Sequence, residues 1–212
     1  MHSCALNASP KKNGVIAKIK MNKKAIILLA DGFEDVEAVT PVDYLRRAGI
    51  EVTSVSISDS TTVTSRWGGI KIIADTTLAE LLRLGCGNFD VTSFDVIIIP
   101  GGIPGATSLA ASAETGELIK KMAAAGKLIC AICASPAVVL APLGLLTGKK
   151  FTCYPGMEEK TKEGTCLNER VVVDGNLITS RAAGTTGEWS IAIIEKLLNK
   201  ETAEKIAKTV LL

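Results

Sequence analysis

Histidine is almost absent from this chain, which removes the commonest partner of a nucleophilic side chain. The only histidine is His2, in a segment that precedes the first predicted strand. A Cys–His dyad or triad is therefore excluded within the folded domain, and histidine-based zinc sites are excluded with it. Any nucleophile here must work with a helix terminus, a carboxyl group or a tyrosine.

Other absences narrow the function further. No apolar stretch approaches the roughly 18 residues that a membrane span needs. The formal net charge is only +2 and the lysines are spread along the chain, so no nucleic-acid partner is expected. The chain contains no Gly-x-x-x-x-Gly-Lys-Ser/Thr phosphate-binding loop, and no Gly-x-Gly-x-x-Gly dinucleotide-binding turn follows the first strand. The six cysteines lack the spacing of a secreted disulfide scaffold, which favours a reducing, cytoplasmic compartment.

Residues 1–22 differ in composition from the rest of the chain. They carry four lysines but no acidic residue and no arginine, and they lack an apolar run long enough for a secretory signal. We expect a disordered tail or processing segment there, followed by a single domain over residues 23–212. Two alternatives stay open, which are organellar import through this tail and a true start at Met21.

From Lys24 onwards, short apolar runs alternate with helical patterns. Strands are expected at 25–30, 52–57, 70–74, 95–99, 128–132, 151–153, 170–173 and 177–179. Helices are expected at 34–48, 78–84, 114–125, 186–198 and 202–209. This alternation predicts an α/β fold with a mostly parallel sheet and helices on both faces. Loops 31–37, 100–105 and 133–136 should then meet at the carboxyl edge of the sheet, where such folds bind ligands.

Cys133 lies at a tight turn between a buried strand and a helix. The apolar run 128–132 predicts the strand, and Pro136 near the first helical turn predicts a helix that runs to Ala141. The layout is that of a nucleophile elbow, and a thiol at the positive end of a helix usually has its pKa lowered to about 3.5–7.5. Cys133 is therefore the candidate nucleophile, and an inert buried cysteine is the alternative.

Cys130 and Cys133 have the spacing of a thioredoxin-type pair. Cys130, however, falls inside the apolar strand, whereas redox pairs lie together at an exposed helix start. Dithiol redox chemistry is therefore disfavoured. With no second pair of this kind, no metal site is expected.

Gly101 and Gly102 directly follow a predicted buried strand. Paired glycines allow successive backbone N–H groups to form a concave anion site, which could stabilise an oxyanion. A tight turn that simply needs glycine is the alternative.

Glu37 is the candidate proton carrier. It lies with Glu34 and Asp35 at the start of the first predicted helix, where acidic residues also suit the helix dipole. Glu37 is not on the stripe formed by Val36, Val39 and Val42, so periodicity does not decide which way it faces. If it faces the cleft, burial would keep the carboxyl protonated, and it could then donate to a thiolate or pass on a proton.

Five ordered motifs resemble the ThiJ/PfpI superfamily, and the nearest branch looks like that of the parkinsonism-associated protein deglycase. The motifs are Asp31-Gly-Phe-Glu-Asp-Val-Glu37, Thr40-Pro-Val-Asp43, Pro100-Gly-Gly102, Ala131-Ile-Cys-Ala-Ser-Pro136 and Thr179-Ser-Arg-Ala-Ala-Gly-Thr185. The resemblance covers nearly everything from Lys23 to Leu212. It implies a flavodoxin-like three-layer α/β sandwich, a homodimer and chemistry that needs no cofactor.

The resemblance also implies roles for individual residues. Cys133 matches the family's reactive, oxidation-prone cysteine, and Glu37 matches the protonated glutamate that hydrogen-bonds its sulfur. Arg66 matches an arginine that reaches the site of the partner subunit. The backbone donors that face the family's site match Gly101, Gly102 and Ala134.

Two departures from the family pattern bear on activity. Related deglycases place a histidine where Tyr154 stands, so histidine-assisted proton transfer is in doubt, although a phenol with a pKa of about 10 could substitute weakly. Peptidase-like branches have a histidine directly after the cysteine. Ala134 occupies that position here, so peptidase activity is not expected.

The expected function is a cofactor-free glyoxalase or protein deglycase that acts on methylglyoxal-type dicarbonyls and early glycation adducts. The alternative is a non-enzymatic oxidative-stress sensor or redox-regulated chaperone, in which Cys133 becomes a sulfinate. Tyr154 adds weight to that alternative. The old family label would add a role in thiamine metabolism, for which the sequence offers no phosphate site.

Overall fold

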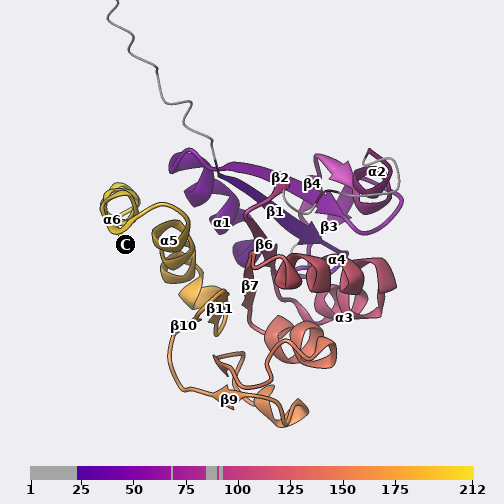
Figure 1. Ribbon diagram of the computed structural model, residues 1–212. Helices are drawn as coiled ribbons and strands as arrows, with labels where there is room; N and C mark the ends of the chain where they lie inside the picture. The colour runs from indigo at the N-terminus through magenta and orange to yellow at the C-terminus, as the bar shows by residue number, and fades with distance from the viewer. Residues whose placement is uncertain (1–22, 68, 85–89, 91–92) are drawn as a thin grey trace, which may run out of the picture.

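The structure of this protein is a computed structural model that describes residues 23–67, 69–84, 90 and 93–212 (Figure 1). The segment predicted to be a tail, residues 1–22, lies outside the described residues, as do Cys4 and Cys86. None of the helices found in the described residues combines the length and the apolar character that a membrane span requires.

A seven-stranded sheet runs through the described residues, in the order β10-β11-β7-β6-β1-β2-β5. Its members in chain order are β1 (Lys24–Leu29), β2 (Glu51–Ser56), β5 (Thr76–Thr77), β6 (Val96–Ile99), β7 (Leu128–Ile132), β10 (Val171–Asp174) and β11 (Leu177–Ser180). Each pairing is parallel except that of β10 with β11, which is the hairpin predicted at Asp174-Gly175. The mostly parallel sheet predicted from the sequence is confirmed.

Helices cover both faces of this sheet, which gives the three layers of a flavodoxin-like α/β fold (Figure 1). One face packs against α1 (Asp35–Arg47) and α5 (Thr186–Leu197), and α6 (Lys200–Thr209) lies against α5. The other packs against α2 (Leu78–Leu84), α3 (Ile103–Ala111) and α4 (Ala113–Ala124). Successive residues of β1 point to opposite faces of the sheet, so Ile26 belongs to the core cluster on one face and Ile27 to the cluster on the other.

Two short pairs of strands lie outside the main sheet. The predicted strand at 70–74 is β4 (Lys71–Ile73), and it pairs with β3 (Thr62–Thr64), which the sequence did not indicate. The predicted strand at 151–153 is shorter than expected. It forms β8 (Lys150–Phe151), which pairs in parallel with β9 (Thr165–Cys166). Short 3₁₀ turns occur at η4 (Glu158–Lys160) and η5 (Ala183–Thr185), among others.

Helix α3 was missed because glycine and proline at its start read as a loop. The structure begins this helix at Ile103, directly after the Gly101-Gly102 turn, with proline in its first turn where a missing N–H costs little. Gly105 lies against Phe33, where a Cβ would come within 2.9 Å of the Phe33 amide nitrogen. Close packing between the helix and the loop therefore explains why glycine, a residue of low helix propensity, stands at this position.

The segment after Cys133 is not the regular α-helix that the sequence predicted. It forms a π-helix, η2 (Pro136–Leu140), and then a 3₁₀ turn, η3 (Ala141–Leu143). Wide π-helical turns are rare and occur frequently at functional sites.

Helix α1 buries a different face from the one its valines suggest. Val36 is 46% exposed and Val39 is 50% exposed, whereas Glu37, Ala38 and Leu45 are buried. The apolar spacing identified the helix correctly. Two of its valines nevertheless form an apolar patch that the described residues leave about half exposed.

Candidate active site

Cys133 occupies a strained turn that other parts of the chain hold in place. Its φ is +63°, a left-handed conformation that costs a residue with a Cβ about 1–2 kcal/mol. The Cys133 N–H donates to the carbonyl of Ser180 at 3.0 Å, and the Cys133 carbonyl accepts from the N–H of Tyr154 at 2.8 Å. These bonds keep the residue at the end of β7, half-buried, in the elbow that the sequence predicted.

Glu37 faces the site from the first turn of α1 and is only 1% exposed. Its Oε2 accepts the Gly101 N–H at 2.8 Å, and the carboxyl also interacts with the Cys133 thiol and the Ala183 amide. Burial raises the pKa of Glu37 from 4.5 to about 7, against the Gly101 hydrogen bond, which lowers it. The carboxyl can therefore bind and release a proton near neutral pH.

The pKa of Cys133 corrects the expectation drawn from its helix terminus. Burial raises the pKa of Cys133 most, the charge and hydrogen bond of the neighbouring Glu37 carboxylate also raise it, and together they take it from 9.0 to about 12. The backbone amides of Ala134 and Gly102 lower the pKa, but by less. Beside an ionised Glu37, the group is a neutral thiol at physiological pH, so its attack on a substrate requires a base.

The two backbone amides of the Gly101-Gly102 turn have different hydrogen-bond partners. The Gly101 N–H is taken up by Glu37, which revises its expected role as a donor to the substrate oxygen. The Gly102 and Ala134 amides interact with the Cys133 sulfur instead. A Cβ on Gly101 would lie 2.6 Å from the Cβ of Cys133 and 2.6 Å from Oε2 of Glu37. Only glycine lets the turn approach both groups.

A cavity of about 530 Å³ opens above the Cys133–Glu37 pair. Its remaining walls come from separate parts of the chain, namely Glu34, Arg66, Trp67, Gly102, Ile103, Ala134, Tyr154, Met157, Ala182 and Ala183. Such a volume suits a small molecule or the modified end of a side chain. The loops predicted to meet at the carboxyl edge of the sheet do meet here.

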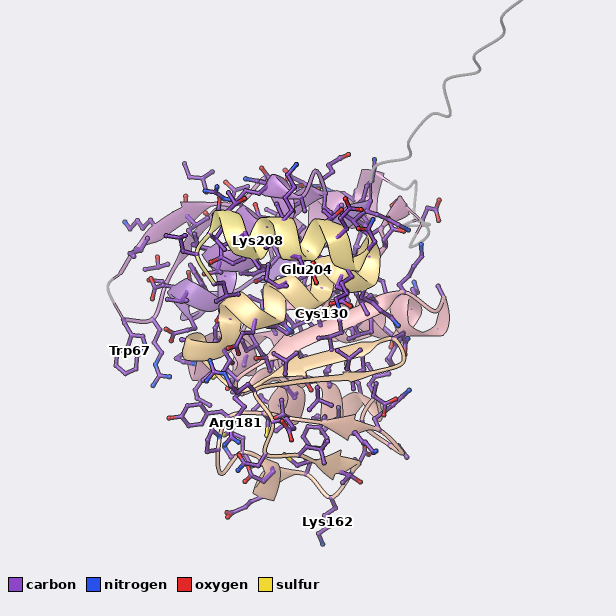
Figure 2. The ribbon with its side chains drawn as sticks, turned by 90° about the vertical axis from the view of Figure 1, so that its left-hand side faces the viewer. Trp67, Cys130, Lys162, Arg181, Glu204 and Lys208 are labelled. Atoms are coloured by element: carbon purple, nitrogen blue, oxygen red, sulfur yellow. The ribbon has the colours of Figure 1, made fainter. Side chains whose placement is uncertain are left out.

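Arg66 and Trp67 form the outer wall of this cavity. The Arg66 guanidinium lies 4.4 Å from the ring centroid of Trp67, and the indole N–H donates to Oε2 of Glu34 at 2.9 Å. Trp67 is 70% exposed and projects from the edge of the molecule (Figure 2). In the single chain Arg66 lines its own cavity, and its reach into a partner's site stays a prediction.

Tyr154 lies at the cavity, as the sequence predicted, with 49% of its surface exposed. Reasoning from the sequence assigned no role to Trp67, Met157 or Ala183. Trp67 could have been found from its position next to Arg66, and Ala183 from its place in the Thr179–Thr185 motif. Met157 carried no such signal.

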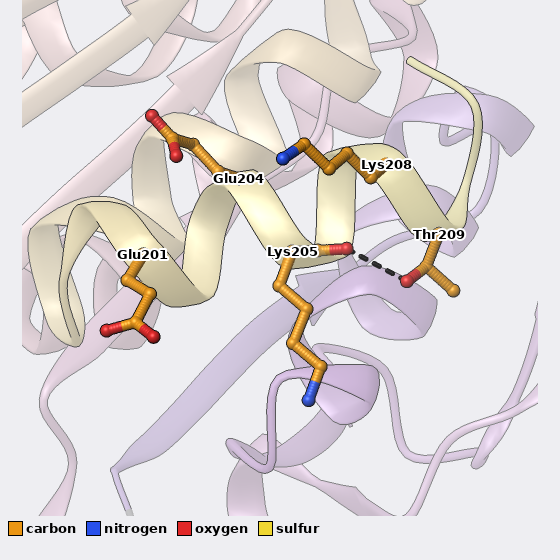
Figure 3. Close-up of a pocket in the computed structure, with 5 residues that line it drawn as sticks. All are labelled: Glu201, Glu204, Lys205, Lys208 and Thr209. Atoms are coloured by element: carbon orange, nitrogen blue, oxygen red, sulfur yellow. Dashed lines mark hydrogen bonds between the residues drawn. The ribbon is translucent and has the colours of Figure 1, made fainter.

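A second hollow, of about 470 Å³, lies along α6 and carries no comparable chemistry. Figure 3 shows its lining side chains fanning out from this one helix, with the Thr209 hydroxyl donating to the Lys205 carbonyl at 2.8 Å. Glu204 and Lys208, two of its lining residues, are spaced one helical turn apart (Figures 2 and 3). This hollow is the solvated charged face of an amphipathic helix.

Comparison with known proteins places this chain in a family. The sequence model of the DJ-1/PfpI family matches residues 23–196. Protein dj-1beta of Drosophila melanogaster is 38% identical over 194 residues, which cover 90% of this chain and 98% of that protein. Glutathione-independent glyoxalase DJR-1.2 of Caenorhabditis elegans is 34% identical, over 88% of this chain and 95% of that protein. Protein DJ-1 homolog B of Arabidopsis thaliana is 39% identical, but this chain spans only 40% of its length.

Solved structures agree with the sequence matches. The crystal structure of Drosophila melanogaster DJ-1beta superposes with a TM-score of 0.82 at 37% identity, covering 91% of this chain and 99% of that one. Oxidized Toxoplasma gondii DJ-1 gives a TM-score of 0.82 at 38% identity, over 89% and 98% of the two chains. Because the family model matches most of the chain and protein dj-1beta is 38% identical over nearly its whole length, this chain belongs to the DJ-1/PfpI family.

Proposed function

We propose that this chain is a cofactor-free glyoxalase that converts methylglyoxal-type dicarbonyls to 2-hydroxy acids and acts by related chemistry on early glycation adducts. One observation carries the proposal, which is the contact of the Cys133 thiol with Glu37, a buried carboxyl whose pKa is about 7. A base with that pKa is well matched to proton transfer at neutral pH. The name of the Caenorhabditis elegans relative supports the same class of reaction.

The first step adds the thiol across the aldehyde carbonyl. The Glu37 carboxylate takes the proton from Cys133 as the sulfur forms a bond to the aldehyde carbon and the carbonyl π bond breaks. The Gly102 and Ala134 amides, which lie against the Cys133 sulfur, would also reach the negative oxygen and stabilise it. The proton held by Glu37 then moves to that oxygen, and the product is a hemithioacetal.

The remaining steps move a hydrogen within the substrate and add water. Glu37 removes the proton from the former aldehyde carbon to give an enediol, and its return to the neighbouring carbon gives a thioester. One water molecule then cleaves the thioester, which releases lactate from methylglyoxal and restores the thiol. One carbon is oxidised and its neighbour reduced, so the electrons balance within the substrate and neither glutathione nor a redox cofactor enters.

We expect the active form to be a homodimer in a cytoplasmic setting that keeps Cys133 reduced. The exposed valines of α1, Val36 and Val39, form an apolar patch that a second copy of the chain would cover. Arg66, at the cavity wall, would then lie close enough to contribute to the partner's site.

A second candidate function uses the same atoms for oxidation sensing. Hydrogen peroxide would convert the Cys133 thiol to a sulfenic and then a sulfinic acid, with one water released at each step. The Gly102 and Ala134 amides and the protonated fraction of Glu37 would stabilise the sulfinate. One solved relative, from Toxoplasma gondii, is described as oxidized.

The decisive experiment measures lactate formed from methylglyoxal without glutathione. Cys133→Ser and Glu37→Gln should each abolish turnover, because one removes the nucleophile and the other removes the base. Glu195→Gln, on the exposed part of α5, and Cys4→Ser are the matched controls and should keep wild-type rates. A folded, reduced wild-type protein that makes no lactate would rule out the glyoxalase.

The sensor function is tested on the same samples. Peroxide should add two oxygen atoms to Cys133, detected by mass spectrometry of the peptide that contains it. Glu37→Gln should change how far this oxidation proceeds. If Cys133 is oxidised while lactate formation is absent, the sensor becomes the supported function.

A further inference from the structure

A second cluster of chemically active side chains lies on the β8–β9 sheet and the turn that follows β8. It consists of Cys153, Glu158 and Cys166, whose ligand atoms all lie within 4.8 Å of one another. The parallel pairing of Phe151 with Cys166 brings the two strands together and so places both sulfurs at one spot. The Cys133 chemistry uses none of these three residues.

This cluster has the form of a site that opens to solvent. Cys153 is buried, whereas Glu158 and Cys166 are exposed, so a small ion could enter from the outer side. A hollow of about 340 Å³ lies there, and Leu167, Asn168 and Arg181 complete its lining. Figure 2 shows Arg181 in the lower half of the molecule, near these short strands.

We propose that Cys153, Glu158 and Cys166 bind a thiophilic divalent cation, for which Zn²⁺ is the best fit. Two sulfurs and one carboxylate oxygen form a donor set that zinc accepts, and a water molecule would complete the tetrahedron. The inference does not depend on the glyoxalase proposal. It also departs from the sequence-based expectation, which considered only sets of histidines or four cysteines.

The distances between the ligand atoms support this assignment. Zn–S bonds of about 2.3 Å and Zn–O bonds of about 2.1 Å place tetrahedral ligands about 3.5–3.8 Å apart. The Cys153 sulfur lies 3.9 Å from Oε2 of Glu158. The three atoms therefore need only small movements, and the exposed side chains of Cys166 and Glu158 can make them.

The charges in the cluster also balance with a dication present. Binding would release one proton from each thiol, which leaves two thiolates and one carboxylate around the metal. The complex would then carry a net charge of −1. Arg181, which lines the same hollow, carries the compensating positive charge.

Occupancy of this site would act on the neighbouring cavity through the chain between the ligands. Tyr154 and Met157 lie between Cys153 and Glu158 in sequence, and both line the Cys133 cavity. A metal that ties Cys153 to Glu158 would restrict that segment. The cluster is thus placed to stabilise one wall of the active site.

The test is a zinc titration of the full-length protein against a chromophoric chelator, with Cys133→Ser as the background to remove the reactive thiol. We expect one zinc ion per chain. Cys153→Ser and Cys166→Ser should each weaken binding by more than about tenfold, and Glu158→Gln should weaken it by about tenfold. Glu163→Gln, an acid in the same loop, and Cys4→Ser should leave binding unchanged.

Cobalt(II) provides an independent spectroscopic readout. Its thiolate charge-transfer absorption should appear in the background protein and disappear in Cys153→Ser and Cys166→Ser, with circular dichroism showing that both variants remain folded. Zinc binding that neither variant weakens would overturn the proposal. A reduced protein that binds no zinc but forms a Cys153–Cys166 disulfide with peroxide would overturn it as well, and would identify a redox pair.

Discussion

At Glu37, burial and hydrogen bonding act on one carboxyl in opposite directions. Burial favours the neutral acid, and the Gly101 N–H favours the carboxylate. Burial is the larger effect, so the folded pKa is about 7 instead of 4.5. The folded protein therefore holds this proton more tightly than the unfolded chain does, and the stability of the protein must depend on pH.

The sign of this dependence gives a first prediction. Stability from the protonated Glu37 is complete below pH 4.5 and is lost as the pH rises through about 7. The shift corresponds to roughly 3 kcal/mol. Wild type should therefore lose up to about 3 kcal/mol in free energy of unfolding between pH 4.5 and pH 8, whereas Glu37→Gln should not show this loss. Urea unfolding of both proteins across this range measures the difference, and an equal offset at every pH would contradict it.

Gly101 leads to a second prediction at this scale. Gly101→Ala would push a methyl group against Cys133 and Glu37 at 2.6 Å, and neither group can move without disturbing the elbow. We expect a loss of about 1–3 kcal/mol in stability, together with most of the methylglyoxal turnover. Gly184→Ala is the control, because a Cβ there meets no atom within 4 Å. Equal turnover in the two variants would show that the close approach at Gly101 is unimportant.

The sequence identified these residues but not their protonation. Cys133 and Glu37 were found from an elbow pattern and a family motif. The rule that a helix terminus lowers a thiol pKa then gave the wrong direction for Cys133. Local sequence shows the helix terminus but not the burial, which arises from packing among segments distant in the chain.

At the scale of elements, the sequence predicted the buried strands better than the irregular segments. The runs at 95–99 and 128–132 became β6 and β7 almost as expected, because continuous apolar residues leave few alternatives. Helix α3 and the π-helix η2 were not predicted. Both depend on tertiary packing around glycine, proline and the elbow, which overrides local propensity.

The elbow between β7 and η2 leads to a third prediction. Cys133 has φ +63°, which glycine adopts without cost. Cys133→Gly should therefore be more stable than Cys133→Ala by about 1 kcal/mol, even though glycine usually destabilises a folded chain. Both variants lack the sulfur, so the comparison isolates the backbone. Denaturant midpoints measure it, and a less stable glycine variant would mean that the turn is not strained.

At the scale of the whole molecule, the fourth prediction concerns the homodimer and the exposed apolar patch on α1. Val36 and Val39 are about half exposed in the single chain. If a second copy covers them, the combined variant Val36→Lys/Val39→Glu should convert a dimer into a monomer. Light scattering during size-exclusion chromatography would show the mass fall by half.

The control for this prediction is Val173→Lys, which places a charge on an exposed valine of β10 and should leave the mass unchanged. A wild-type protein that is already monomeric would contradict the expected homodimer. A dimer that survives the double variant would place the interface on another surface.

The long sequence separation within the site has a consequence for how the protein folds. The Glu37–Gly101 hydrogen bond joins residues 64 positions apart, and Cys133 is tied to Ser180 and Tyr154. Contacts of this kind form only after large loops have closed, so the elbow environment should mature late in refolding. Until then, Cys133 keeps an ordinary pKa near 9.0 and is more ionised than in the finished protein. Nascent or misfolded chains should therefore be alkylated faster at this sulfur, and the slowing of alkylation would time the final stage of folding.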